Sequence, residues 1–175
     1  MIGASPSRDD VEARVLSAVM RLRKHDGYLL EVGANERSIT HHLANYIQQE
    51  FEEYSVDVEY NRNHREPKRL EIPEELKEDV KKNDVSRKDE NAKTVFPDII
   101  VHTRGTSEQN FLVVEVKKKG SEQIDGMDNR KLKAFTKPDS EDGLGYSWGL
   151  HLVLDCEASS KDSLTWYEQG ERHRE

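Results

Sequence analysis

Apolar residues recur three or four positions apart in residues 9–24 and again in residues 36–53, which predicts a helix in each range. In the first range they are Val11, Val15, Leu16, Val19 and Leu22. In the second they are Ile39, Leu43, Tyr46, Ile47 and Phe51, which we assign to the core. Asn35 precedes the second helix and can cap it, with Glu36 in its first turn. Gly27 and Gly33 flank residues 28–32, which are predicted to form a strand or a turn.

Later apolar runs are shorter and predict strands. Residues 55–60 alternate apolar and acidic positions, and residues 95–101 and 111–116 are predominantly apolar runs separated by a turn that contains Gly105. This pattern predicts one half-buried strand followed by a hairpin. Pro138 ends a helix predicted at 125–136, and a loop at 139–147 leads to a strand at 148–154. We expect an edge strand at 164–167 and a frayed end at 170–175.

Residues 61–94 differ from the rest of the chain. Only six of these 34 residues are apolar, and ten Lys or Arg nearly balance nine Asp or Glu. We interpret the segment as a long exposed insertion with a short helix at 74–82, whose first position suits Pro73. An insertion of this length inside a compact domain is often functional.

The element order predicts an α/β fold with a mixed sheet. A chain of 175 residues fits one domain, 1–175, with enough length to bury a core. The single cysteine, Cys156, excludes an internal disulfide framework and a multi-cysteine metal site. The first ten residues have no apolar signal region, and no apolar run is long enough to cross a membrane. We therefore expect a cytoplasmic protein without a membrane partner.

Charge is distributed unevenly. The net charge of −8 argues against a protein that coats nucleic acid. Residues 116–137 nevertheless hold seven Lys or Arg and three Asp or Glu, a local net of +4. This stretch is either a solvated surface or a phosphate-binding face, and the candidates for binding nucleic acid are Lys118, Lys119, Arg130, Lys131 and Lys133.

Three charged residues stand beside the apolar runs of the predicted hairpin. Asp98 precedes one strand, and Glu115 and Lys117 share one face of the other because side chains alternate along a strand. Burying such charges is costly unless they pair or bind a metal. Two carboxylates can hold Mg²⁺, with Mn²⁺ as a substitute, and the backbone carbonyl of Val116 is a further ligand. A lysine beside them can orient a water and stabilise negative charge, which suits phosphodiester hydrolysis.

Pro97-Asp98, followed 17 positions later by Glu115-Val116-Lys117, resembles the PD-(D/E)XK nuclease superfamily. The resemblance covers residues 36–155. It implies a restriction-endonuclease-like fold, with a mixed central sheet flanked by helices, and a Mg²⁺-dependent nuclease that cleaves DNA. It also implies that Asp98 and Glu115 are metal ligands, that Lys117 is the catalytic lysine and that Glu36 is an auxiliary acid. The insertion at 61–94 is long for this family.

Other interpretations remain open. Asp98 is also suited to a strand start, and Glu115 and Lys117 to a solvent-facing pair on an edge strand. The helix dipole alone favours Glu36 in a first turn. His102 follows the strand that begins near Asp98, and His151 lies in the strand predicted at 148–154. Either histidine could approach the site, although isolated histidines in strands more often pack. The alternative functions are an inactive member of the same fold that binds protein or nucleic acid, and a metal-dependent hydrolase of a small phosphorylated substrate. An acidic nuclease core suggests a homodimer or a larger complex.

Overall fold

The fold is that of a computed structural model, which describes residues 6–60, 62–63, 66–67, 96–106, 109–121, 126–138, 144–157 and 161–173. Within these ranges the chain forms three helices and a six-stranded mixed sheet with open edges. The predicted α/β class and the predicted element order are confirmed. The helix predicted at 74–82 and part of the loop predicted at 139–147 lie outside the described residues. No helix within the described ranges is long and apolar enough to cross a membrane.

Helix α1 spans Arg8–Glu31 and is longer than predicted. Ser7 caps it in a reciprocal capping box with Asp10. The prediction of a strand or turn at 28–32 is wrong. Asp26 adopts a non-helical conformation (φ −125°, ψ 21°), so the helix kinks there and continues. The turn beyond the kink buries Leu30, which explains why the chain remains helical past a glycine.

Helix α2 spans Glu36–Glu50 and ends before the predicted residue 53. The Asn35 side chain accepts a hydrogen bond from the backbone amide of Ser38 at 2.9 Å, which confirms the predicted cap. Phe51 leaves the helical conformation (φ −124°, ψ 55°) although its ring is fully buried. Phe51 fits the apolar spacing of the helix because its ring is buried in the core, although the residue itself is not helical.

The main sheet has the strand order β1-β4-β5-β6-β7-β8. Its strands are β1 Ser55–Val58, β4 Ile99–His102, β5 Asn110–Lys118, β6 Trp148–Leu154, β7 Ser163–Glu168 and β8 Glu171–Arg172. β5 and β6 are parallel and the other neighbours are antiparallel. Strands β2 Arg62–Asn63 and β3 Glu66–Pro67 pair separately.

The C-terminal part of the sheet corrects two predictions. β7 is not an edge strand, because β8 pairs with it on its outer side. The predicted fraying of 170–175 is wrong for residues 170–173, because Gly170 has a positive φ of 77° that turns the chain back into β8. Glycine adopts this left-handed conformation readily, so it permits a tight turn in a charged tail.

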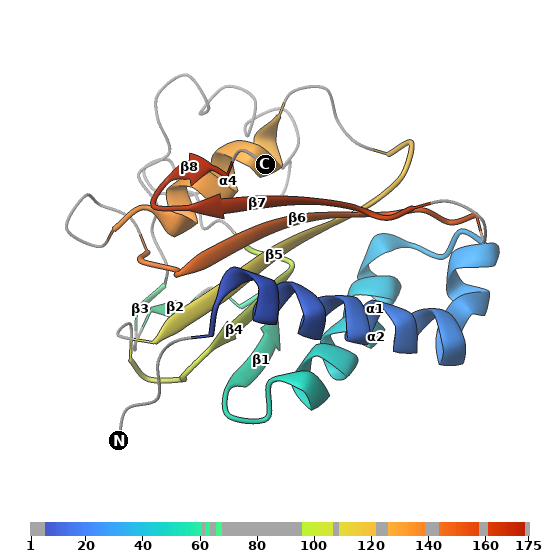
Figure 1. Ribbon diagram of the computed structural model, residues 1–175, viewed down its shortest axis with the longest axis horizontal. Helices are drawn as coiled ribbons and strands as arrows, with labels where there is room; N and C mark the ends of the chain where they lie inside the picture. Colours follow the sequence, from blue (N-terminus) through green and yellow to red (C-terminus); the bar gives the residue numbers. More distant parts are fainter. Residues whose placement is uncertain are drawn as a thin grey trace.

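Helices α1 and α2 lie on one side of the sheet, and α4 (Met127–Thr136) lies on the other (Figure 1). Alternate residues of β5 therefore enter different layers. Val114 and Val116 pack in the cluster formed with α1 and α2, whereas Val113 packs with α4. Glu115 and Lys117 continue the face of Val113. This alternation places both charged residues on the α4 side of the sheet.

The approach of α4 to the sheet depends on Gly149 in β6. A Cβ at this position would lie 2.9 Å from the methyl carbon of Thr136 and 3.4 Å from a methyl carbon of Leu132. Glycine therefore lets the helix pack closely on the strand. This packing fixes where the first turn of α4 lies relative to β5.

Candidate active site

Asp98 and Glu115 meet on neighbouring strands. The register pairs Ile99 with Val114, so the next position along β4 places Asp98 opposite Glu115. The backbone amide of Val116 donates a hydrogen bond to Asp98 Oδ2 at 2.7 Å. β5 lies between β4 and β6, and Glu115 is fully buried. The interpretation of Glu115 and Lys117 as a solvent-facing pair on an edge strand is therefore wrong.

The negative charge of Glu115 is only partly balanced by the groups around it. Its Oε2 lies 3.3 Å from Lys131 Nζ, whereas its Oε1 is buried without a hydrogen-bond partner among the described residues. Burial, and then the negative charge of Asp98, raises the pKa of Glu115 well above its ordinary value. Burial also raises the pKa of Asp98. Both shifts indicate that this pair of carboxylates lacks positive charge.

Lys117 is held between two further acids. Its Nζ lies 3.3 Å from Glu36 Oε2 and 3.5 Å from Asp128 Oδ2. Burial alone would lower the pKa of Lys117, but the charges of Asp128, Asp98 and Glu36 outweigh it and raise that pKa. Lys117 is therefore an ammonium group here, suited to stabilising negative charge. The structure brings together all four predicted catalytic residues, Glu36, Asp98, Glu115 and Lys117.

Asp128 was not among the predicted site residues, whereas its neighbour His151 was noted as able to approach the site without being assigned a role. Asp128 lies in the first turn of α4 and contacts Lys131 at 3.6 Å as well as Lys117. His151 pairs in register with Glu115, and its Nε2 lies 4.0 Å from Asp128 Oδ2. The spacing of Asp128 and Lys131 placed them on one helix face, a signal that the sequence contained.

The predicted nucleic-acid-binding residues have different surroundings. Lys118 Nζ donates to the backbone carbonyls of Gly33 and Ala34, at 3.2 and 3.0 Å. Lys119 pairs with buried Asp155, and Lys131 pairs with Glu115. Arg130 is exposed on α4. Lys133, the fifth candidate, pairs with Glu171 at 3.0 Å. The contacts of Lys118, Lys119, Lys131 and Lys133 within the chain were not part of the prediction.

The donor set fits a hard divalent cation. Glu115 Oε1 is a buried oxygen to which no described residue donates a hydrogen bond, and the neighbouring Asp98 supplies a second carboxylate. Among the described residues, no group of three or more His, Cys, Asp or Glu side chains is arranged to hold a metal ion. The Val116 carbonyl, water and a substrate phosphate would have to complete the coordination. Mg²⁺ suits this arrangement, because it commonly binds one or two carboxylates and keeps several waters.

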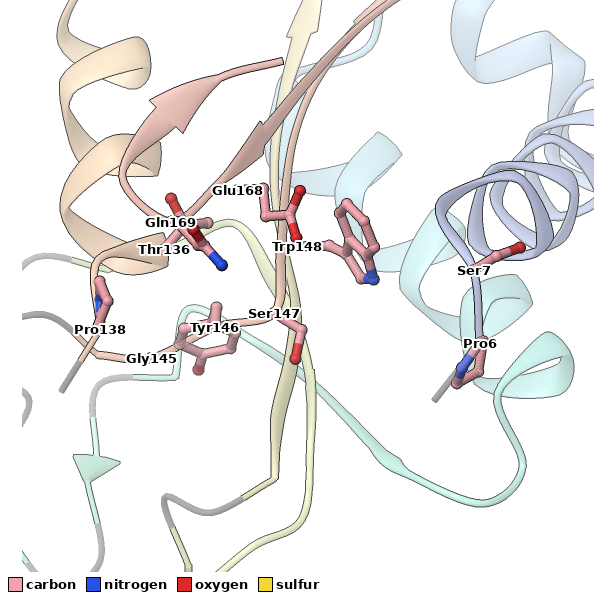
Figure 2. Close-up of a pocket in the computed structure, with 10 residues that line it drawn as sticks. All are labelled: Pro6, Ser7, Thr136, Pro138, Gly145, Tyr146, Ser147, Trp148, Glu168 and Gln169. Atoms are coloured by element: carbon pink, nitrogen blue, oxygen red, sulfur yellow. The ribbon is translucent and has the colours of Figure 1, made fainter. Parts of the chain in front are cut away.

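Two hollows lie on the surface. One, of about 410 Å³, adjoins the site and is lined by Glu36, Arg37, Thr40, His41, Val58, Glu59 and Asp98. The other, of about 520 Å³, adjoins Thr136 at the far end of α4 from Asp128, and Figure 2 shows it bordered by Tyr146, Trp148 and Gln169. The described lining of the second hollow includes none of the predicted catalytic residues.

Comparison with known proteins gives no independent assignment. No protein-family model, curated protein or solved structure matches this chain. The functional argument therefore depends on the geometry of Asp98, Glu115 and Lys117 and on the residues that contact them.

Proposed function

We propose that this protein is a Mg²⁺-dependent nuclease of the PD-(D/E)XK superfamily that hydrolyses phosphodiester bonds in DNA. The observation that carries the proposal is that Asp98 and Glu115 meet at one end of a strand pair, with the Lys117 ammonium on the same face. Within the part of the chain that the structure describes, one buried oxygen of Glu115 has no hydrogen-bond partner. Perturbed pKa values in such a cluster are typical of functional sites.

The arrangement of elements supports the family assignment. Helix α2 precedes three antiparallel strands, β1, β4 and β5, and α4 leads to β6, which runs parallel to β5. Helix, three strands, helix and strand is also the core order of the restriction-endonuclease-like fold that the resemblance implies. Asp98 directly precedes β4, Glu115 and Lys117 lie in β5, and Glu36 lies in the preceding helix α2.

The side chains have distinct roles in this mechanism. A cation held by Asp98 and Glu115 would polarise the phosphate and lower the pKa of a bound water. The Lys117 ammonium, oriented by Glu36 and Asp128, donates to a phosphate oxygen and stabilises the charge that develops during attack. Glu36 Oε1 accepts a hydrogen bond from the Ser121 hydroxyl. This contact helps to hold the Glu36 carboxylate, whose other oxygen contacts Lys117.

A phosphate substrate is also consistent with the local electrostatics. The first turns of α2 and α4 both reach the site, through Glu36 and Asp128. The N-terminal end of a helix carries partial positive charge that favours phosphate. The chain as a whole has a net charge of −8, so we expect contacts with DNA to be confined to this region or supplemented by a dimer or a larger complex.

The test is cleavage of labelled DNA by the full chain with Mg²⁺ or Mn²⁺, on double-stranded and single-stranded substrates, with RNA in parallel. Cleavage should require the cation and should be lost in Asp98→Asn. The matched control is Asp57→Asn, a carboxylate on β1 that contacts Arg104 instead of the site, and it should retain cleavage. Cleavage by Asp98→Asn at the parent rate would refute the mechanism. Absence of cleavage by the parent on every substrate would favour the inactive nuclease-fold alternative.

A further inference from the structure

Lys131 lies between two carboxylates at the base of the site. Its Nζ is 3.3 Å from Glu115 Oε2 on β5 and 3.6 Å from Asp128 Oδ1 on its own helix. Its side chain is about one quarter exposed, whereas that of Glu115 is almost completely buried. The ammonium group therefore approaches Glu115 from the open side of the site, while Glu115 is fixed within the sheet.

A cation bound to Glu115 would meet this ammonium group. Two positive charges that share one carboxylate in a partly buried site repel each other strongly, because the local dielectric constant is low. The lysine stem is flexible, and Asp128 offers a second carboxylate one helical turn away. Lys131 can therefore leave Glu115 without losing all ionic compensation.

We propose that Lys131 is the counter-ion of Glu115 when the site holds no metal, that a divalent cation displaces it, and that Asp128 receives the displaced ammonium group. Lys131 and Asp128 are thus positioning residues that set the affinity of the site for its cation. The inference rests on the metal site of the proposed function. It also gives Lys131 a role that differs from the direct phosphate contact expected from its place in the basic stretch.

The first measurement is Mn²⁺ binding by calorimetry to the full-length parent and to Lys131→Met, which keeps most of the stem and removes the charge. Mn²⁺ should bind the variant about tenfold or more tightly, because the competing charge is gone. If Lys131 only held the site in shape, breaking the pair would leave Mn²⁺ binding unchanged or weaken it, apart from the general charge effect that Lys133→Met measures. Equal or weaker Mn²⁺ binding by Lys131→Met, or no binding by either protein, would overturn the proposal.

Matched variants separate charge from packing. Lys133→Met changes a lysine on the same helix that pairs with Glu171, and it should keep the parent affinity. Lys131→Arg preserves the positive charge and should stay near the parent value, so tighter binding by this variant would count against a charge effect. Melting curves establish that each protein is folded, and Lys131→Gln replaces Lys131→Met if the latter does not fold.

The role of Asp128 is tested in two backgrounds. Asp128→Asn should weaken Mn²⁺ binding in the parent. Of the two carboxylates that contact Lys131, only Glu115 would remain charged, so Lys131 would compete more strongly with the cation for Glu115. The same substitution should have little effect in Lys131→Met. An equal loss in both backgrounds would mean that Asp128 acts on the cation directly and would overturn its assignment as the receiving group.

These outcomes are independent of nuclease activity. Tighter Mn²⁺ binding by Lys131→Met together with no cleavage of any nucleic acid would support the exchange of counter-ions and refute the nuclease. Metal-dependent cleavage together with unchanged Mn²⁺ affinity in Lys131→Met would support the nuclease and refute the exchange of counter-ions.

Discussion

Charged clusters lie near the two ends of β4, one built on Asp57 and the other on Asp98 and Glu115, and they shift the pKa values of these carboxylates in opposite directions. Asp57 contacts Arg104 through both carboxylate oxygens, and Nε2 of His102 lies 2.9 Å from its Oδ2. The hydrogen bond from Arg104 is the largest effect and lowers the pKa of Asp57. At the other end, burial raises the pKa values of Asp98 and Glu115.

The difference separates a charge cluster that stabilises the fold from one suited to bind a ligand. Asp57 has a guanidinium and an imidazole as partners, so its negative charge is favoured. Asp98 and Glu115 lie side by side and leave a buried oxygen unpartnered among the described residues. A bound cation beside Asp98 and Glu115 would therefore stabilise the charged form of both carboxylates.

The largest expected effect distinguishes the basic residues of the two clusters. Lys117→Ala should lower the rate of DNA cleavage by about 10²–10⁴-fold, because the developing charge loses its ammonium partner. Arg104→Ala removes the guanidinium group that contacts Asp57, and it should change the cleavage rate by less than about threefold. Steady-state cleavage assays with Mg²⁺ measure both. Comparable losses in the two variants would remove the functional distinction between the clusters.

The next effect is on stability. Asp57→Asn should lower the free energy of unfolding by about 1–3 kcal/mol at neutral pH, because it weakens charge-assisted bonds to Arg104 and buried His102. Asp98→Asn should leave that free energy unchanged or raise it, because it removes a charge disfavoured by burial. Urea denaturation of both variants provides the measurement. A larger loss in Asp98→Asn would show that the site carboxylates stabilise the fold.

The two clusters should also give opposite pH dependences. Folded Glu115 retains a proton that the unfolded chain releases above about pH 4.3, so its contribution to stability falls as the pH rises through and beyond that value. The contribution of Asp57 is present above about pH 3.9 and is lost as the pH falls through its lowered folded-state pKa.

Glu115→Gln tests this difference directly. In the absence of metal, it should be more stable than the parent at pH 7 by about 0.5–2 kcal/mol, the usual gain from a single stabilising substitution. The advantage should shrink toward pH 4, whereas any loss in Asp57→Asn should shrink only in more acidic solution. Thermal unfolding in EDTA across this pH range measures both trends. A constant difference between Glu115→Gln and the parent would contradict the assigned shift.

The sequence predicted the elements because their apolar periods are strong. Residues 148–154 form a strand in full, and Leu43 and Ile47 are buried as expected. Predictions from the local sequence pattern were wrong where tertiary contacts determine the local structure. Helix α1 passes a glycine because Leu30 is buried beyond the kink, and the charged residues Glu171 and Arg172 form a strand because they pair with β7.

The candidate site was predictable in part for the same reason. Asp98, Glu115 and Lys117 are linked by a hairpin, so strand alternation and register bring them together. Asp128 and His151 depend on how α4 and β6 pack against β5, which no short motif specifies. The partner of Lys131 is likewise set by tertiary packing, since a basic helix face is compatible with solvent, phosphate or a buried carboxylate.

The smallest expected effect concerns this packing. Gly149→Ala places a Cβ 2.9 Å from the methyl carbon of Thr136, and α4 must shift slightly away from the sheet. We expect a loss of about 1 kcal/mol in stability, at the low end for overpacking. Mn²⁺ affinity should change by about two- to threefold, because α4 carries Asp128 and Lys131 to the site. Gly27→Ala in α1 is the control, since a Cβ there meets no other part of the described structure within 4 Å. It should preserve Mn²⁺ affinity and should not lower stability, because alanine favours helix more than glycine does. If Gly149→Ala lowers stability and leaves Mn²⁺ affinity unchanged, the position of α4 does not control the charge balance of the site, and the contrast with the Asp57 cluster then resides in β4 and β5 alone.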